Sequence, residues 1–381
     1  MKVVVTIQHP AHVHFYKYVI DELEARGHDV YVFARENDLA IPLLNAYGIP
    51  HEVLAGPQNS LSELVQVQLC YELRLLERTR RINPDVMTAI GGVAVSHVAP
   101  LVGARSVVFI DNEGTSSHRV TTPFAHVVAT PRNHDVEYGS NHVRYDGFHE
   151  LAYLDPAYFE PDPERLRAAG VDPDERYFVL RFRKWDALHD VGEAGLSLEG
   201  KRTLVSVLAE HGTVYITSTD PLPEDLEQYA LPVSPTHIHD LLYYADCYAG
   251  DSATMATEAA LLGTPTVRIQ SFAARGTDMT NFIELEETYD LLRSTADETE
   301  GIELVREIVA DDRTPERWRS RRERLFEEKI DVTAYVTELL CAQGGARTYS
   351  ALERTQTKAP PEGEPSPSTQ PTQPDITAMD D

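Results

Sequence analysis

Short apolar runs alternate with stretches of helical spacing along the first part of the chain. The runs are rich in β-branched residues, and the stretches between them place apolar residues three and four positions apart, so they predict alternating strands and helices. Such alternation is typical of a parallel sheet with helices on both faces. The predicted strands are Lys2–Ile7, Asp29–Ala34, His51–Leu54, Asp85–Ile90, Ser106–Ile110 and Val143–Asp146, and the predicted helices are Val13–Ala25, Asp38–Tyr47, Leu61–Arg81 and Val93–Val102.

The same alternation starts again at Tyr177, after a segment rich in proline and charge. It predicts a second doubly wound unit with strands Tyr177–Phe182, Val214–Ser218, Leu231–Val233, Cys247–Ala249 and Thr266–Ile269, and with helices at Leu198–Glu210 and Asp297–Ala310. The chain is too long for one ordinary core, so two domains are expected. The expected boundaries are residues 1–155 for an N-terminal Rossmann-like domain, 156–174 for a linker, 175–314 for a C-terminal Rossmann-like domain, 315–345 for a helical region that crosses back, and 353–381 for a disordered Pro-rich acidic tail.

The residues around Gly250 predict an anion-binding turn. A short strand ends there, a small polar turn follows, and a helix runs to Leu262, with Gly263 placed to cap it in the left-handed conformation. The first N–H groups of a helix have no partner inside it, and the helix dipole favours negative charge, so such a turn binds phosphate. The candidate donor-binding residues of the turn are Gly250, Asp251, Ser252, Ala253 and Thr254.

Glu258 lies farther along the same predicted helix. It shares a face with Asp251 and Thr254, beside an apolar stripe that can pack on a sheet, so we expect this polar face to be open to a ligand. A carboxylate about a turn and a half beyond a phosphate site is placed to accept hydrogen bonds from ribose hydroxyls. The alternative is a surface helix with a good N-cap.

Polar residues collect where the strands of the N-terminal unit end, which is where open parallel sheets bind ligands. One of the histidines there can act as a general base, because the ordinary histidine pKa lies near neutrality. The alternatives for the histidines after the first strand are a metal site, for which no acidic partner is evident, and the capping of a helix start. The candidate catalytic residues are His12, His14, Asp111, Glu113 and His149.

A dense polar loop follows the first strand of the C-terminal unit. Arg181 and Arg183 lie at its start, and an arginine there can clamp a diphosphate through two parallel hydrogen bonds. Trp185 can stack on a base or fill the domain core, and the sequence does not decide between these.

The segment ADCYAGDSATMATEAALLGTPTV resembles the nucleotide-sugar motif of GT-B glycosyltransferases and of the related non-hydrolysing UDP-N-acetylglucosamine 2-epimerases. The whole chain is similar to the family of predicted glycosyltransferases known as domain of unknown function 354. The segments that carry this likeness are HPAHVHFYKYVIDELEARGHDVYVFAR, DGFHELAYL, LRFRKWDALHDVG, ITSTDPLPEDLEQY and GDSATMATEAALLGTP. The resemblance implies two Rossmann-like domains that face a cleft, with an acidic residue on the helix that holds the ribose.

The composition and net charge of the chain limit the classes of partner that we expect. The chain has 61 acidic and 34 basic residues, a net charge of −27, which argues against nucleic-acid binding and suits a halophile's acidic surface. Its three cysteines show no pairing pattern, no signal sequence precedes the first strand, and no apolar run is long enough to span a membrane. We therefore expect a cytoplasmic protein, and peripheral membrane association stays open.

These patterns and the resemblance together predict a glycosyltransferase that uses a nucleotide-diphosphate sugar donor, a glycan or lipid-linked acceptor, and neither a metal nor another cofactor. The sequence leaves two alternatives open. A nucleotide-sugar 2-epimerase would interconvert two sugars without an acceptor, whereas a non-catalytic nucleotide or glycan sensor would only bind. The many ionisable residues at strand ends count against the sensor.

Overall fold

The computed structural model describes residues 1–37, 39–56, 61–114, 117–182, 196–218, 220–270, 273 and 278–345, except the side chains of residues 61–65. Arg183, Trp185 and the predicted tail at 353–381 lie outside the described residues.

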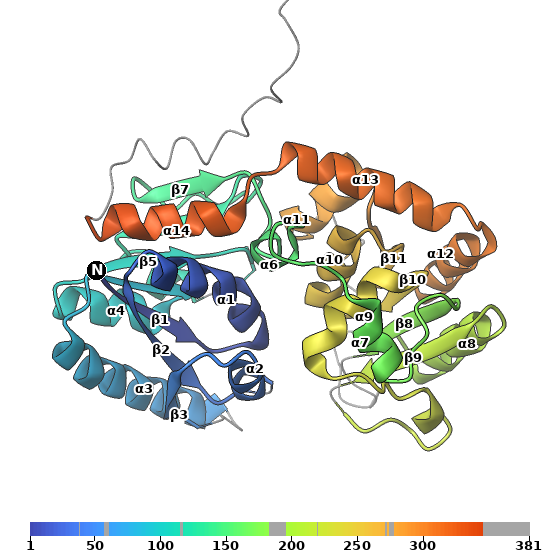
Figure 1. The fold of residues 1–381 in the computed structure, drawn as a ribbon, viewed down its shortest axis with the longest axis horizontal. Helices are drawn as coiled ribbons and strands as arrows, with labels where there is room; N and C mark the ends of the chain where they lie inside the picture. The colour runs from blue at the N-terminus through green and yellow to red at the C-terminus, as the bar shows by residue number, and fades with distance from the viewer. Residues whose placement is uncertain are drawn as a thin grey trace, which may run out of the picture.

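The N-terminal domain is built on a parallel sheet of seven strands (Figure 1). Its strands are β1 (Lys2–Ile7), β2 (Asp29–Arg35), β3 (His51–Ala55), β4 (Val86–Ile90), β5 (Arg105–Phe109), β6 (Val127–Pro131) and β7 (His142–Tyr145). They lie in the order β3-β2-β1-β4-β5-β6-β7. The helices that connect them are α1 (Pro10–Ala25), α2 (Ala40–Ala46), α3 (Leu61–Ile82), α4 (Val93–Leu101) and the short α5 (His118–Thr121).

The C-terminal domain has a smaller parallel sheet with the order β12-β11-β10-β8-β9. Its strands are β8 (Tyr177–Phe182), β9 (Thr213–Ser218), β10 (Cys247–Gly250), β11 (Thr266–Ile269) and β12 (Arg293–Thr295). Its helices are α7 (Pro163–Ala168), α8 (Leu198–Ala209), α9 (Ile238–Tyr244), α10 (Ala253–Leu262), α11 (Thr280–Ile283) and α12 (Glu298–Ala310), and short 3-10 turns occur at Glu227–Tyr229 and Pro235–His237.

The observed elements differ from the sequence expectations at several places. Residues 231–233 form no strand, because the chain there makes only a single bridge, between Ile216 and Ala230, at the edge of β9. The strands β6 and β12 were not expected. The helix after β1 begins at Pro10 rather than Val13 because the side chain of His9 caps it. The predicted left-handed cap at Gly263 is confirmed, with a φ of 81°.

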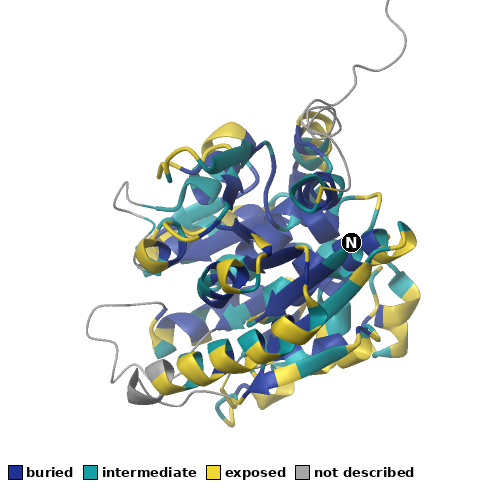
Figure 2. Ribbon diagram, turned by 90° about the vertical axis from the view of Figure 1, so that its left-hand side faces the viewer, coloured by how far each residue is buried: buried dark blue, intermediate teal, exposed yellow. Residues whose placement is uncertain are grey.

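One continuous apolar core joins the two domains. It runs from β1 and α1 through the short helix α6 (Leu151–Leu154) to α10 and the inner face of the C-terminal sheet. Separate cores fill the outer faces, one beneath α3 and α4 and the other beneath α8 and α12. Figure 2 shows the buried strands between helices whose outer faces are exposed. The core therefore holds α1 and α6 of the N-terminal domain and α10 of the C-terminal domain in one packed unit.

The last two helices connect the domains a second time. The helix α13 (Thr314–Glu328) packs on α10 of the C-terminal domain, and α14 (Val332–Gln343) packs on α1, α6 and the N-terminal sheet (Figure 1). Lys329, between them, contacts Asp146 at 2.7 Å and Glu284 at 2.5 Å, one carboxylate from each domain. No helix among the described residues is long and apolar enough to cross a membrane.

Candidate functional site

The turn between β10 and α10 forms a capped helix N-terminus. Ser252 is the N-cap, and its side chain accepts a hydrogen bond from the backbone N–H of Met255. The first-turn residues Ala253, Thr254 and Met255 are only partly buried, whereas α10 is buried from Ala256 to Leu262. The first N–H groups of α10 are therefore the part of this helix that a ligand can reach.

Gly250 is required by the close approach of the neighbouring strand. A Cβ at this position would lie 2.2 Å from the carbonyl oxygen of Arg181, far inside contact distance. The N–H of the following residue, Asp251, donates to the same carbonyl at 3.2 Å. The glycine thus lets β8 and the turn meet, and it leaves no side chain between the sheet and the first turn of α10.

Two arginines flank Gly250 on the sheet. Arg181 pairs with Gly250 on one side and Arg268 on the other, and the alternation of inner and outer positions places both arginines on the face that α10 covers. Arg181 donates to Thr217 Oγ1 at 3.0 Å. Arg268 is buried and ion-paired with Asp278, so its charge is neutralised within the domain. Arg181 is the one of the two for which the sequence predicts a phosphate role.

Glu258 does not lie on an open polar face. It is buried, with 4% of its surface exposed, and its Oε1 accepts hydrogen bonds from the hydroxyl of Tyr153 at 2.8 Å and from His239 Nε2 at 3.1 Å. The expectation of a solvent-facing stripe is therefore wrong, because α6 and α9 cover this part of α10. His14 belongs to the same buried group, since its ring lies 4.7 Å from that of His239.

Asp111 and His149 form a carboxylate–imidazole pair beyond the ends of β5 and β7. Asp111 Oδ2 lies 3.2 Å from His149 Nδ1, and His149 is buried, its ring 4.9 Å from that of Phe15. Neither ring nitrogen of His149 has a hydrogen bond of good geometry among the described residues. An imidazole held beside a carboxylate, with its far nitrogen unengaged, is arranged to accept or donate a proton.

Three side chains at this pair have different protonation states at neutral pH. Burial lowers the pKa of His12 to about 3, so its ring is neutral near pH 7. Burial raises the pKa of Asp111, but the His149 ring and hydrogen bonds outweigh that effect and hold it at about 2. Burial and the nearby Asp111 charge raise the pKa of Glu150 to about 8, so this carboxyl is protonated at neutral pH. A neutral imidazole, an ionised carboxylate and a protonated carboxyl therefore lie together.

Apart from the residues of the α10 turn and Arg181, the predicted site residues form three groups. His12, Asp111 and His149 lie together, Glu258 and His14 share the buried junction, and Glu113 lies apart, where its Oε1 accepts a hydrogen bond from the Thr280 hydroxyl of the other domain. The structure adds residues that the sequence argument did not assign: Glu150, Tyr153, His239 and Arg268. The signal for Arg268 was present, because a charged residue inside an apolar strand run needs a buried partner.

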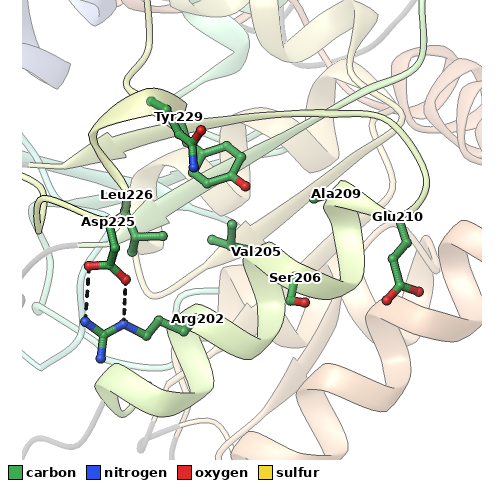
Figure 3. Close-up of a pocket in the computed structure, with 9 residues that line it drawn as sticks. Arg202, Val205, Ser206, Ala209, Glu210, Asp225, Leu226 and Tyr229 are labelled. Carbon is green, nitrogen blue, oxygen red and sulfur yellow. Dashed lines mark hydrogen bonds and ion pairs between the residues drawn. The ribbon is translucent and has the colours of Figure 1, made fainter.

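A surface hollow of about 430 Å³ lies elsewhere, between α8 and the 3-10 turn at Glu227–Tyr229 (Figure 3). An ion pair between Arg202 and Asp225, at 2.9 Å, closes one side of it. Because α8 packs on the outer face of the C-terminal sheet, this hollow is on the opposite side of the sheet from Gly250. It is therefore separate from the candidate site.

The protein family described as "Protein of unknown function (DUF354)" matches residues 1–331, which include every candidate site residue. The chain belongs to the DUF354 family. An uncharacterized protein of Methanocaldococcus jannaschii is 23% identical over 272 residues, which cover 67% of this chain and 78% of that protein.

This DUF354 chain also resembles solved structures of low sequence identity. A spinosyn forosaminyltransferase is 14% identical with a TM-score of 0.59, over 90% of this chain and 99% of that one. The UDP-GlcNAc 2-epimerase of Neisseria meningitidis, bound to UDP-GlcNAc, is 12% identical with a TM-score of 0.61, over 90% and 99%. A calicheamicin glycosyltransferase is 14% identical with a TM-score of 0.55, over 91% and 99%. The DUF354 chain thus has the GT-B fold of two Rossmann-like domains.

Proposed function

We propose that this DUF354 protein is a metal-independent glycosyltransferase that takes its sugar from a nucleotide-diphosphate donor. The observation that supports this most strongly is the placement of the α10 turn and Arg181 in one domain and of the Asp111–His149 pair in the other, at one junction. Tyr153, four residues after His149, reaches α10 directly. Solved proteins named as glycosyltransferases share this fold.

The donor side rests on the first turn of α10. Its N–H groups and the guanidinium of Arg181 would bind the diphosphate, and they would stabilise the charge that develops when the bond between the sugar and the phosphate oxygen breaks. Glu258 would accept ribose hydroxyls in exchange for the hydrogen bond from Tyr153, so donor binding would loosen one contact between the domains. In this scheme a helix N-terminus and an arginine supply the positive charge that a metal provides elsewhere.

The acceptor side rests on His149. Its Nε2 would take the proton of the attacking acceptor hydroxyl, and Asp111 would orient the ring and stabilise the imidazolium that forms. The acceptor oxygen then bonds to the anomeric carbon, and the diphosphate leaves with the electron pair of the broken bond. The neutral ring of His12 and the protonated Glu150 can each hold a hydroxyl group of the sugar or the acceptor by a hydrogen bond.

A 2-epimerase is the second candidate, and one observation favours it. The loop after β5 carries two carboxylates, and each lies beside an imidazole: Asp111 beside His149 at 3.2 Å, and Glu113 beside His134 at 3.4 Å. Two separate acid–base pairs are what removal and return of a proton at a sugar carbon would use. A glycosyltransferase needs only one acid–base pair.

Incubation with UDP-N-acetylglucosamine and other nucleotide sugars at high KCl, followed by NMR of the products, separates the candidates. Conversion between two epimers without an acceptor supports the epimerase, whereas release of the nucleoside diphosphate only with a glycan or lipid-linked acceptor supports the transferase. Binding of a nucleotide sugar without conversion under any condition would leave the non-catalytic sensor as the remaining candidate.

The catalytic assignment is tested in the same assay. His149→Gln should lower turnover by about two to four orders of magnitude while it preserves donor binding. The matched control is His211→Gln, which changes an exposed histidine at the end of α8 and should leave turnover unaltered.

A further inference from the structure

Residues 329–333, which connect α13 to α14, pack against the loop that carries His149. We call these residues the connector. The loop, residues 146–150, joins the end of β7 to the start of α6. Lys329 of the connector and Asp146 of the loop are 183 positions apart in the chain, so only the folded protein brings them together.

The connector holds the loop at the residues that precede His149. Ile330 donates its backbone N–H to the carbonyl oxygen of Asp146 at 3.1 Å. Lys329 Nζ donates to Asp146 Oδ1 at 2.7 Å, and it lies 5.6 Å from the centre of the Phe148 ring. The connector therefore binds Asp146 through both its backbone and its side chain.

The connector also packs against the loop backbone at Gly147 and against α6 after His149. A Cβ at Gly147 would lie 2.6 Å from Val332 Cγ2, so Val332 packs directly on the loop with no space for a side chain there. Thr333 donates its hydroxyl proton to the carbonyl oxygen of Ala152 at 2.6 Å. His149 thus lies between two points at which the connector contacts its segment of the chain.

Lys329 joins this loop to the C-terminal domain. Its Nζ also donates to Glu284 Oε1 at 2.5 Å, and Glu284 directly follows α11. The Phe282 ring of α11 lies 3.6 Å from the guanidinium of Arg268, which pairs with Gly250 in the sheet. One ammonium group therefore binds the loop of His149 and a segment that packs on the strand beside the α10 turn.

Lys329 is charged in the folded protein although it is buried. Burial alone would lower its pKa, but the hydrogen bonds to Asp146 and Glu284 outweigh that effect and raise the pKa to about 12. The side chain is held firmly, because the loss of either bond would leave a buried charge without its partner. At 8% exposure, little water reaches the ammonium to replace a lost carboxylate.

We propose that Lys329 is a positioning residue that holds the loop of His149, so that the imidazole stays beside Asp111 and faces the donor side. This inference rests on the proposed function, in which His149 takes the proton of the acceptor. A displacement of a catalytic group by about 1 Å can lower turnover by about 100-fold. Loss of Lys329 should therefore lower kcat and leave the donor KM nearly unaltered, because the α10 turn keeps its own cap and sheet pairing.

Steady-state kinetics with the nucleotide-sugar donor test this role. Lys329→Met should lower kcat by about 10- to 100-fold and leave the donor KM within about twofold of the wild type. Lys329→Arg keeps a cation that can donate to both carboxylates, so it should recover most of the lost kcat.

Tyr158→Phe is the matched control. It removes the hydrogen bond from the Tyr158 hydroxyl to Asp331 Oδ2 at 2.9 Å, which is a connector contact that does not involve the loop. This variant should keep the wild-type kcat. A raised KM with an unaltered kcat in Lys329→Met, or an equal fall of kcat in Tyr158→Phe, would overturn the positioning role.

Gly147→Ala perturbs the same contact without removing a charge. Its Cβ would push the loop away from Val332, so kcat should fall here too, even if Lys329→Met fails to fold. An unaltered kcat in a folded Gly147→Ala protein would overturn the inference.

The position of the imidazole can also be measured without turnover. NMR should show a nuclear Overhauser effect between the rings of His149 and Phe15, whose centres lie 4.9 Å apart. The signal should persist in Tyr158→Phe and weaken or vanish in Lys329→Met and Gly147→Ala, and an unaltered signal in both would overturn the positioning role. A protein that turns over no nucleotide sugar would overturn the proposed function, whereas this ring contact would still decide whether Lys329 positions His149.

Discussion

Replacement of Glu258 by alanine should destabilise the fold. Its Oε1 accepts two hydrogen bonds at 4% exposure, from the Tyr153 hydroxyl at 2.8 Å and His239 Nε2 at 3.1 Å. A buried donor that loses its acceptor costs about 1–3 kcal/mol, so two such donors cost roughly 2–6 kcal/mol together. The sequence alone predicts the opposite result. It places Glu258 on a cleft-facing position of a helix, where alanine, the best helix former, would leave the free energy of unfolding almost unchanged.

Chemical denaturation of Glu258→Ala beside the wild type measures this loss. Tyr153→Phe is the matched variant, because it removes one of the two donors and should cost roughly half as much. The double variant should cost less than the sum of the two single ones, since the residues share one hydrogen bond. A Glu258→Ala protein as stable as the wild type would refute the buried placement of this carboxylate and would restore the open polar face.

Three further outcomes follow from the structure. Gly250→Ala should lower the free energy of unfolding by about 1–3 kcal/mol or more and should abolish donor binding, because its Cβ would lie 2.2 Å from a carbonyl oxygen. Gly56→Ala should be neutral in the same denaturation experiment, because among the described residues, chain neighbours aside, its Cβ would meet no atom within 4 Å. The melting temperature should rise steeply with KCl, because the net charge of −27 repels itself over a Debye length of about 30 Å at 0.01 M salt; no dependence on salt would contradict this. The raised pKa of Glu150 means that its contribution to stability is fully present below its ordinary pKa and is lost as the pH rises to about 8. The wild type should therefore lose stability relative to Glu150→Gln across that range, and parallel pH profiles would count against the raised pKa of this carboxyl.

Local pattern was enough to predict most of the fold. Apolar runs with helical segments between them identified β1 to β5, β7 and the strands around Gly250, and the left-handed cap at Gly263 followed from the residue type. The strand β6 was not predicted, and it ends in a proline, a residue that is unfavourable inside a strand. Residues 231–233 were taken for a strand because an apolar run carries no information about whether a sheet edge is available to pair with it.

The sequence also predicted part of the candidate site, because local pattern indicates where strands end but not how distant elements pack. The ends of parallel strands meet at one edge, so the nearness of Asp111 and His149 could be anticipated from the order of strands and helices. The burial of Glu258 could not be anticipated, because a helical wheel shows which residues share a face and not which element covers that face. The contact between Glu113 and Thr280 joins residues 167 positions apart and depends on how the domains meet.

Calorimetric titration of nucleoside diphosphates and their sugars, at high KCl, tests the central claim most directly. The account predicts that at least one diphosphate binds and that Arg181→Ala weakens it by about one to two orders of magnitude, through the loss of a charged hydrogen-bond donor. Arg202→Ala, which changes an arginine on the opposite face of the same sheet, should leave the affinity unchanged. Failure of every diphosphate to bind, or equal affinity for Arg181→Ala and the wild type, would contradict the assignment of the α10 turn as the donor site.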